Sequence, residues 1–167
     1  MPRLSAARKI LITGLGTGYL PVAPGTWGSA AAAAVFVLVA WGSGRHAACT
    51  SGVMIALAVV ATGGCVALGR FAEETFGRKD PSQCSLDEWA GQALTYAFLP
   101  LGAGWSDLLI VAAAGFVAFR LFDIVKPSPA QRAQHLPAGW GIVLDDLVAA
   151  VYANVACQLL LRLWLLR

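Results

Sequence analysis

The chain has 167 residues, of which 58% are hydrophobic and only 13% are charged, with a mean hydropathy of +0.69 and a formal net charge of +3. Soluble domains contain roughly 45–50% apolar and about 25% charged residues, so the composition favours a membrane-embedded or membrane-docked protein over a very apolar soluble oligomer. The small net charge comes without a basic stripe interleaved with aromatic residues, so nucleic acid is excluded as a partner. The length predicts a single domain over residues 1–167.

The N-terminal segment is basic, and the apolar residues after it are interrupted. Residues 1–9 carry Arg3, Arg8 and Lys9 and are expected to be flexible. Residues 10–29 alternate short apolar patches with Gly and Pro, which indicates a loop or re-entrant segment and argues against a cleaved signal peptide.

Five apolar segments follow, and each is predicted to be helical. None shows the alternation of a strand, and Ala and Leu dominate, so the expected fold is all-α and multihelical. A membrane-spanning helix needs ~20 apolar residues. The first segment runs from Ser29 to Gly42 or Gly44, with Thr26 or Ser29 as its N-cap, and the other four are residues 52–69, 86–101, 107–126 and 142–166. By length, the second, fourth and fifth segments can cross a membrane. The first and third are short, and we expect them to be tilted or half-buried.

Charge predicts which ends of these segments share a face. If the basic N-terminus is cytoplasmic and the middle segments alternate, residues 70–86 and 127–141 lie inside, with more Lys and Arg than the outside loops, as membrane proteins prefer. All but one of the nine acidic residues then collect at the cytoplasmic face, and only Asp107 lies opposite. The acidic residues at this face are Glu73, Glu74, Asp80, Asp87, Glu88, Asp123, Asp145 and Asp146.

Two pairs of adjacent carboxylates stand at the edges of apolar stretches. Neighbouring like charges beside apolar surface are poorly solvated, so a cation is expected with them. Asp87 and Glu88 follow Ser85 at a helix N-terminus, where a simple capped helix start is an equal alternative. Asp145 and Asp146 interrupt a continuing apolar pattern, which favours a metal or cationic partner. Because adjacent helical residues point about 100° apart, only one member of each pair is expected to point squarely into a cleft.

Asp123 is predicted to lie in the last turn of a helix, where the dipole disfavours a carboxylate. Arg120 stands three residues before it and Lys126 three residues after it. A local ion pair with Arg120 is one explanation. The functional alternative gives Asp123 to a metal, and gives Arg120 and Lys126 to an anionic substrate.

A carboxylate set without a His or Cys ligand set suits Mg²⁺, which is commonly bound together with substrate phosphate oxygens. The segment APGTWGS, residues 23–29, can complement it, because its glycines allow close approach of an anion and its hydroxyls and helix N-terminus offer hydrogen-bond donors. The substrate-binding candidates there are Gly25, Thr26 and Ser29. Signatures of cysteine, haloacid-type and histidine phosphatases and of P-loop proteins are absent from the sequence, which leaves metal-assisted hydrolysis by carboxylates.

Four motifs in order are more specific than any one of them. APGTWGS, KDP-x4-LDEWAGQ, FRLFDIVKPSP and GWGIVLDDLVAA, within residues 14–154, resemble those of the phosphatidylglycerophosphatase A family. Ala138 and Ala150 stand where glycine is usual. The resemblance implies an all-helical enzyme of the bacterial inner membrane that uses Mg²⁺ to remove the terminal phosphate of phosphatidylglycerophosphate. It implies acidic site residues Asp80, Asp87, Glu88, Asp123, Asp145 and Asp146, and polar or basic site residues Thr26, Ser29, Arg120 and Lys126.

The resulting hypothesis is a lipid phosphomonoesterase whose site faces the cytoplasm and whose partners are an anionic phospholipid and the membrane. A subset of the six acidic residues binds one or two Mg²⁺, Arg120 and Lys126 neutralise phosphate oxygens, and either water or a carboxylate attacks phosphorus. Three points stay open, namely another membrane phosphomonoester as substrate, a cation-binding transporter or channel subunit instead of an enzyme, and assembly into a homo-oligomer.

Overall fold

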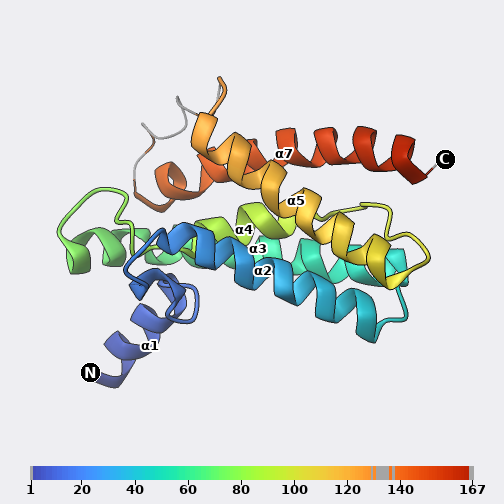
Figure 1. Cartoon of the computed structure of the whole chain (residues 1–167). Coiled ribbons are helices and arrows are strands. Elements are labelled where there is room, and N and C mark those ends of the chain that lie inside the picture. Colours follow the sequence, from blue (N-terminus) through green and yellow to red (C-terminus); the bar gives the residue numbers. More distant parts are fainter. Residues whose placement is uncertain (1, 129, 131–135, 137, 166–167) are drawn as a thin grey trace.

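The computed structural model describes residues 2–128, 130, 136 and 138–165, and every regular element in this part of the chain is helical (Figure 1). The all-α prediction is therefore confirmed. The elements are α1 (Pro2–Ile12), the 3-10 helix η1 (Thr17–Tyr19), α2 (Pro24–Gly42), α3 (Ala47–Phe76), α4 (Leu86–Thr95), α5 (Trp105–Val125) and α7 (Ala138–Leu165).

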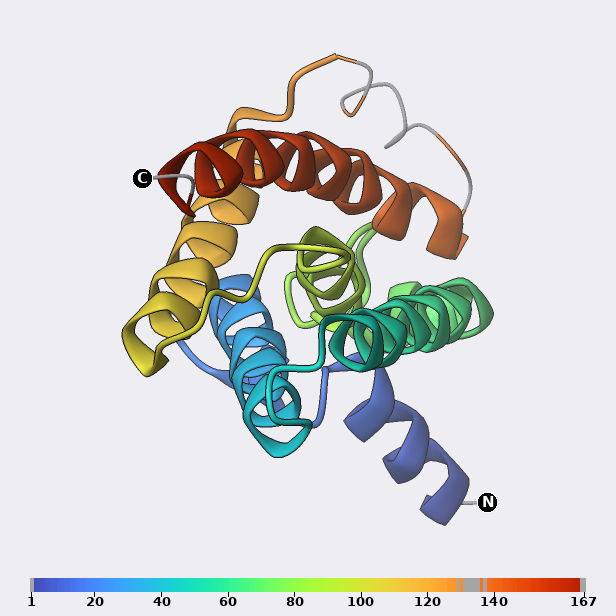
Figure 2. The ribbon, with the colours of Figure 1, turned by 90° about the vertical axis from the view of Figure 1, so that its right-hand side faces the viewer.

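The short helix α4 occupies the centre of the molecule. Figure 2 shows it enclosed by α2, α3, α5 and α7. Directly after α4, Tyr96 is fully buried, stacks on Phe36 of α2 with ring centroids 4.1 Å apart, and donates a 2.7 Å hydrogen bond to the carbonyl of Ala112 in α5. Because α4 packs against these four helices, they fix the position of its first turn.

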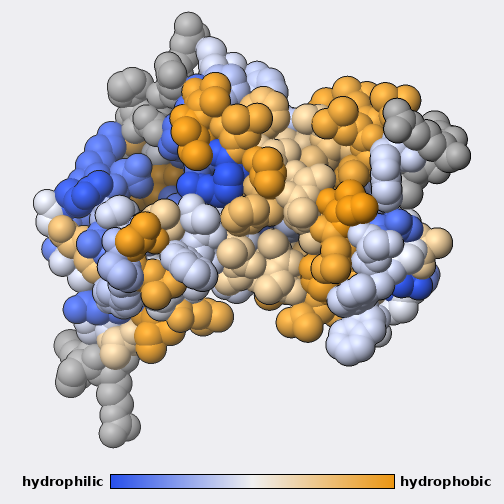
Figure 3. All heavy atoms as spheres, viewed as in Figure 1, coloured by the Kyte–Doolittle hydropathy of each residue, from blue (hydrophilic) through white to orange (hydrophobic). Residues whose placement is uncertain are grey.

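Four of the helices are long and apolar enough to cross a membrane, namely α2, α3, α5 and α7. Exposed apolar side chains such as Leu38, Val60, Val117 and Leu160 lie on these helices. Figure 3 shows hydrophobic residues over the middle of one face of the molecule and hydrophilic residues gathered at the end where α3 stops. Such a band is what a membrane-associated protein needs.

The N-terminal segments differ from the predictions in their secondary structure. Residues 2–9 belong to helix α1, and residues 10–29, predicted as a loop or re-entrant segment, contain regular structure on both sides of η1. Helix α2 begins at Pro24, because proline fits the first helical turn, where its missing N–H is not needed. Its N-cap is Ala23, so neither Thr26 nor Ser29 has that role, and the earlier start gives this segment the 19 residues of a candidate span.

The remaining boundaries follow the predicted pattern more closely. α3 extends beyond its predicted apolar run at both ends, and α7 begins four residues before its predicted start. The third segment forms helix only to Thr95 and continues as turns, so α4 is short, and it lies enclosed by the longer helices.

One end of the bundle collects the starts of α2, α4 and α7 and the ends of α3 and α5 (Figure 1). The predicted grouping of acidic residues at one end is therefore confirmed. Asp107 lies at the opposite end, where its Oδ2 accepts hydrogen bonds from the backbone N–H groups of Ala103 at 3.0 Å and Gly104 at 2.9 Å. It has a structural role at the start of α5.

Candidate active site

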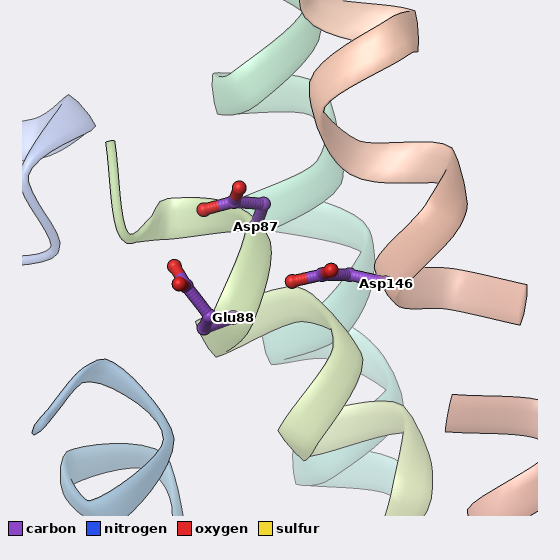
Figure 4. A group of neighbouring side chains, drawn as sticks. All are labelled: Asp87, Glu88 and Asp146. Carbon is purple, nitrogen blue, oxygen red and sulfur yellow. The ribbon is translucent and has the colours of Figure 1, made fainter. Parts of the chain in front are cut away.

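Three carboxylates converge at the start of α4. Asp87 and Glu88 stand in its first turn, and Asp146 reaches toward them from α7 (Figure 4). Each offers one oxygen, and these oxygens lie within 4.8 Å of one another. Asp87 is 6% exposed and Asp146 is 4% exposed. Carboxylate oxygens this close, and this far from bulk water, could hold a hard cation.

The start of α4 is positioned by hydrogen bonds from Ser85. This residue occupies the N-cap position, but its hydroxyl donates to the carbonyl of Thr13 at 2.9 Å and pairs with the hydroxyl of Thr17 at 2.8 Å. The side chain therefore ties α4 to the turn after α1 and does not cap the helix. Asp87 and Glu88 meet the positive end of the helix dipole, which stabilises negative charge on this pair.

Burial makes this group of acids reluctant to ionise without a cation. Burial raises the pKa of Glu88 to about 8; a hydrogen bond with Asp87 works against this rise, and the charges of Asp146 and Asp123 add to it. Burial and the charge of Glu88 raise the pKa of Asp87 well above its ordinary value. Asp87 Oδ1 and Glu88 Oε2 are buried, and neither has a hydrogen-bond partner in the described part of the chain. These oxygens are available to a ligand.

The two members of the second carboxylate pair point to different partners. Asp146 joins the cluster with Asp87 and Glu88, whereas Asp145 accepts a short hydrogen bond from Lys126 Nζ. The expectation that only one member of each pair points squarely into a cleft does not hold. Asp145 and Asp146 both line the pocket described below, and Asp87 and Glu88 both belong to the carboxylate cluster.

Arg120 and Lys126 bring positive charge to the acids from the end of α5. Arg120 forms a 2.8 Å ion pair with Asp123 and a 3.4 Å hydrogen bond to the hydroxyl of Ser29. Lys126 lies 3.8 Å from Asp123, and its contact with Asp145 outweighs the effect of burial and raises its pKa. The local Arg120–Asp123 pair is therefore present, and it lies within the larger charged cluster.

A pocket of about 330 Å³ opens over this cluster. All six acidic residues assigned by the resemblance line it together with Lys126, and Asp80 stands at its exposed rim in a left-handed backbone conformation. The acidic residues are Asp80, Asp87, Glu88, Asp123, Asp145 and Asp146. Thus the structure brings together residues from the α3–α4 loop, α4, α5 and α7.

The segment APGTWGS lies beside the pocket and does not line it. A Cβ at Gly25 would stand 1.9 Å from Oε1 of Glu88, so the glycine lets α2 approach this carboxylate. Ser29 is buried and donates to the carbonyl of Gly25 at 3.0 Å, and Thr26 is half-buried in the first turn of α2. In this geometry the segment supports Glu88 and Arg120.

Sequence reasoning missed Gln92. It is fully buried, and neither its Nε2 nor its Oε1 has a hydrogen-bond partner among the described residues. Gln92 stands one helical turn after Glu88 in the motif LDEWAGQ, so the i, i+4 spacing is the signal that could have found it.

Known proteins are similar in sequence to this chain over almost its whole length. The family model described as Phosphatidylglycerophosphatase A matches residues 10–161. The chain belongs to the phosphatidylglycerophosphatase A family. Its members are named as phosphatases, which agrees with a carboxylate cluster placed beside two cationic side chains.

Three curated relatives are similar to the chain. A protein of Haemophilus influenzae named "Phosphatidylglycerophosphatase A" is 32% identical, and the match covers 94% of this chain and 90% of the relative. One of the same name from Escherichia coli is 31% identical, with 89% and 80% covered. A Bacteroides thetaiotaomicron protein named "Putative phosphatidylinositol-3-phosphatase" is 31% identical, with 93% and 94% covered. No solved structure matches the chain.

Proposed function

We propose that this phosphatase hydrolyses the terminal phosphomonoester of phosphatidylglycerophosphate and releases phosphatidylglycerol and inorganic phosphate, with Mg²⁺ as its cofactor. The observation that carries the proposal is the convergence of Asp87, Glu88 and Asp146 within 4.8 Å, next to Lys126. The names of two relatives supply the substrate.

The residues of the cluster fit Mg²⁺. Asp87 and Glu88 each have a buried oxygen without a partner among the described residues, and the donor set is made of carboxylates, which this hard cation prefers. Asp87, Glu88 and Asp146 would hold the ion. When bound, Mg²⁺ would supply Lewis-acid stabilisation of phosphate oxygens and acidify a coordinated water.

The protein's own side chains have separate tasks around the reacting phosphate. Lys126, held by Asp145, brings an ammonium group to the phosphate oxygens. Asp123 keeps Arg120 at the edge of the site. Asp80 stands at the exposed rim, where it can accept the proton of an attacking water. Direct attack by a carboxylate is the alternative, and single-turnover hydrolysis in ¹⁸O-labelled water followed by analysis of the protein separates the two routes.

The decisive experiment is phosphate release by detergent-solubilised protein from a panel of lipid phosphomonoesters, with and without Mg²⁺. Phosphatidylglycerophosphate should be the best substrate, and chelation of the metal should abolish turnover. The relative named for phosphatidylinositol 3-phosphate makes that lipid the second candidate. Preference for it would replace the substrate and keep the chemistry, whereas absence of phosphate release from every lipid would refute the proposal.

We place the protein in the bacterial inner membrane with the site on the cytoplasmic side. Cys49 tests this orientation, because it is exposed near the start of α3, at the end opposite the site, while Cys65, Cys84 and Cys157 are buried. A membrane-impermeant maleimide should label Cys49 in intact spheroplasts. Labelling that requires permeabilised membranes would reverse the orientation.

A further inference from the structure

The line of contact between α2 and α5, called the seam below, begins at the carboxylate site. The chemical character of its side chains changes in a fixed order with distance from that site. On α5, Asp123 belongs to the site, Arg120 follows one turn further in, and Phe116 one turn beyond that. On α2 the corresponding order is Gly25 and then Ser29, followed by apolar residues. The seam therefore runs from acidic, through cationic and polar, to apolar.

The cationic and polar part of the seam, its middle level, contains the guanidinium group of Arg120, which uses only some of its hydrogen-bond donors within the described structure. One nitrogen of Arg120, Nη1, contacts both Asp123 and Ser29 and so bridges α5 and α2. The Nε of Arg120 is buried and has no hydrogen-bond partner among the described residues. It is a donor available to an anion.

Gln92 belongs to the same level. On α4, Gln92 lies one turn after Glu88, which packs against Gly25 of α2. It lies one turn before Tyr96, which contacts Phe36 of α2 and Ala112 of α5. Residues four apart share a helix face, so Gln92 faces the α2–α5 seam. Its amide is fully buried, with both polar atoms unpartnered in the described structure. A buried amide in this state is costly unless a ligand supplies its hydrogen bonds.

Beyond this level the seam opens into an apolar groove of about 270 Å³. Its lining includes Ala34 and Val37 of α2 and Ala113 and Phe116 of α5. In Figure 3 the surface between α2 and α5 is apolar, and a hydrophilic spot lies beside it on the side of the site. Small side chains on two facing helices leave room for a slender apolar occupant.

The lipids in the names of the relatives have the same order of chemical groups. Phosphatidylglycerophosphate and phosphatidylinositol 3-phosphate both carry a phosphomonoester on a polyol, then a phosphodiester, then acyl chains. We propose that the α2–α5 seam binds the lipid part of the substrate, with Arg120 and Gln92 on the phosphodiester and an acyl chain in the groove. This inference rests on the proposed function, because the substrate's monoester must occupy the carboxylate site.

The hydrogen-bonding groups of the lipid match the groups of Arg120 and Gln92 that have no partner in the described part of the chain. Phosphodiester oxygens only accept, and they would receive the Arg120 Nε–H and the Gln92 Nε2–H; Gln92 Oε1 would accept from a hydroxyl of the polyol. The groove between α3 and α7 is larger, at about 410 Å³, and neither this groove nor the α2–α5 groove has a charged side chain among its described lining residues. The α2–α5 groove, however, continues a seam that contains Arg120. The groove between α3 and α7 serves as the control.

The product phosphatidylglycerol isolates this binding from catalysis, because it keeps the phosphodiester and acyl chains and lacks the terminal phosphate. We expect dioleoyl phosphatidylglycerol, titrated into detergent-solubilised full-length protein, to raise the melting temperature. Gln92→Leu and Ala34→Leu should each weaken this binding about tenfold, which is the loss of a hydrogen bond to a charged group or of an apolar contact.

One control should bind the product like the parent protein. Gly63→Leu fills the other groove at a position where a Cβ meets nothing within 4 Å. Should Gln92→Leu fail to fold, Ala34→Leu and Ala113→Leu carry the test, since both alanines are exposed. Unchanged binding in the seam variants, loss of binding in Gly63→Leu alone, or no binding to the parent would overturn the inference. Failure of the proposed function would instead appear as absence of phosphate release by the parent.

Discussion

Glu88 lies so close to Gly25 that a Cβ on the glycine would stand 1.9 Å from Oε1 of the carboxylate. This contact joins the first turn of α2 to the first turn of α4. The carboxylate cluster therefore depends on a residue that contributes no side chain to it.

Gly25→Ala should lower kcat/KM at least about tenfold, because the added methyl group must displace Glu88 from Asp87 and Asp146. The measurement is phosphate release from micellar phosphatidylglycerophosphate. Gly52→Ala in α3 is the matched control, since a Cβ there meets nothing within 4 Å and alanine favours a helix. Equal activity of Gly25→Ala and the parent would show that Glu88 is not held by this contact.

Asp87→Asn and Asp146→Asn should each reduce kcat at least about a hundredfold while the protein stays folded, because each removes a negative ligand and keeps the shape of the side chain. Asp107→Asn, at the opposite end of α5, should retain activity. Circular dichroism in detergent checks that the variants are helical, and near-normal turnover by either site variant would remove that residue from the cluster's function.

Lys126→Met should impair both activity and stability. Asp145 is 2% exposed and loses the ammonium group that it contacts, while Lys126 is 26% exposed, so we expect a loss of about 1–3 kcal/mol, less than for a fully buried pair. Denaturant titration in micelles measures this loss. Adding Asp145→Leu should restore stability without restoring hydrolysis; restored hydrolysis would mean that Lys126 serves only to neutralise Asp145.

Stability without metal should decrease as the pH rises. The pKa of Glu88 is about 8 in the folded protein and near 4.5 when unfolded, so the folded state binds this proton more tightly. The resulting stabilisation is complete below the unfolded pKa and is lost as the pH rises through about 8. Melting temperatures of chelator-treated protein across this range test the direction, and Glu88→Gln should flatten the dependence.

The stabilisation by Mg²⁺ should increase as the pH rises, because the ion competes with protons for the same carboxylates. Its apparent affinity should rise up to about tenfold per pH unit for each proton displaced, until the pH reaches about 8. The gain in melting temperature on adding Mg²⁺ should therefore be larger at about pH 8.5 than at about pH 6.5. An equal gain at both values would place the ion away from Glu88.

The hydrogen bond between Ser29 and Arg120 shows where a prediction from residue type was wrong. An N-cap role for Thr26 or Ser29 was a reasonable prediction from residue type, yet Pro24 begins α2 earlier and leaves Ser29 buried, with its hydroxyl between Gly25 and Arg120. Helix boundaries depend on a few residues at each end, and long-range contacts can use a hydroxyl that a local rule assigns to a cap.

The sequence by itself determined the helical fold, the apolar segments and the grouping of acidic residues at one end, because hydrophobic periodicity, length and charge act locally along the chain. The ordered motifs also predicted the family. Only the tertiary structure decided which acids meet, because it buries the start of α4 among α2, α3, α5 and α7: Asp146 joins Asp87 and Glu88, Asp145 turns to Lys126, and Gln92 faces the seam without a partner in the described structure. These pairings arise between helices far apart in the chain, where no local pattern specifies which side chains will share a ligand.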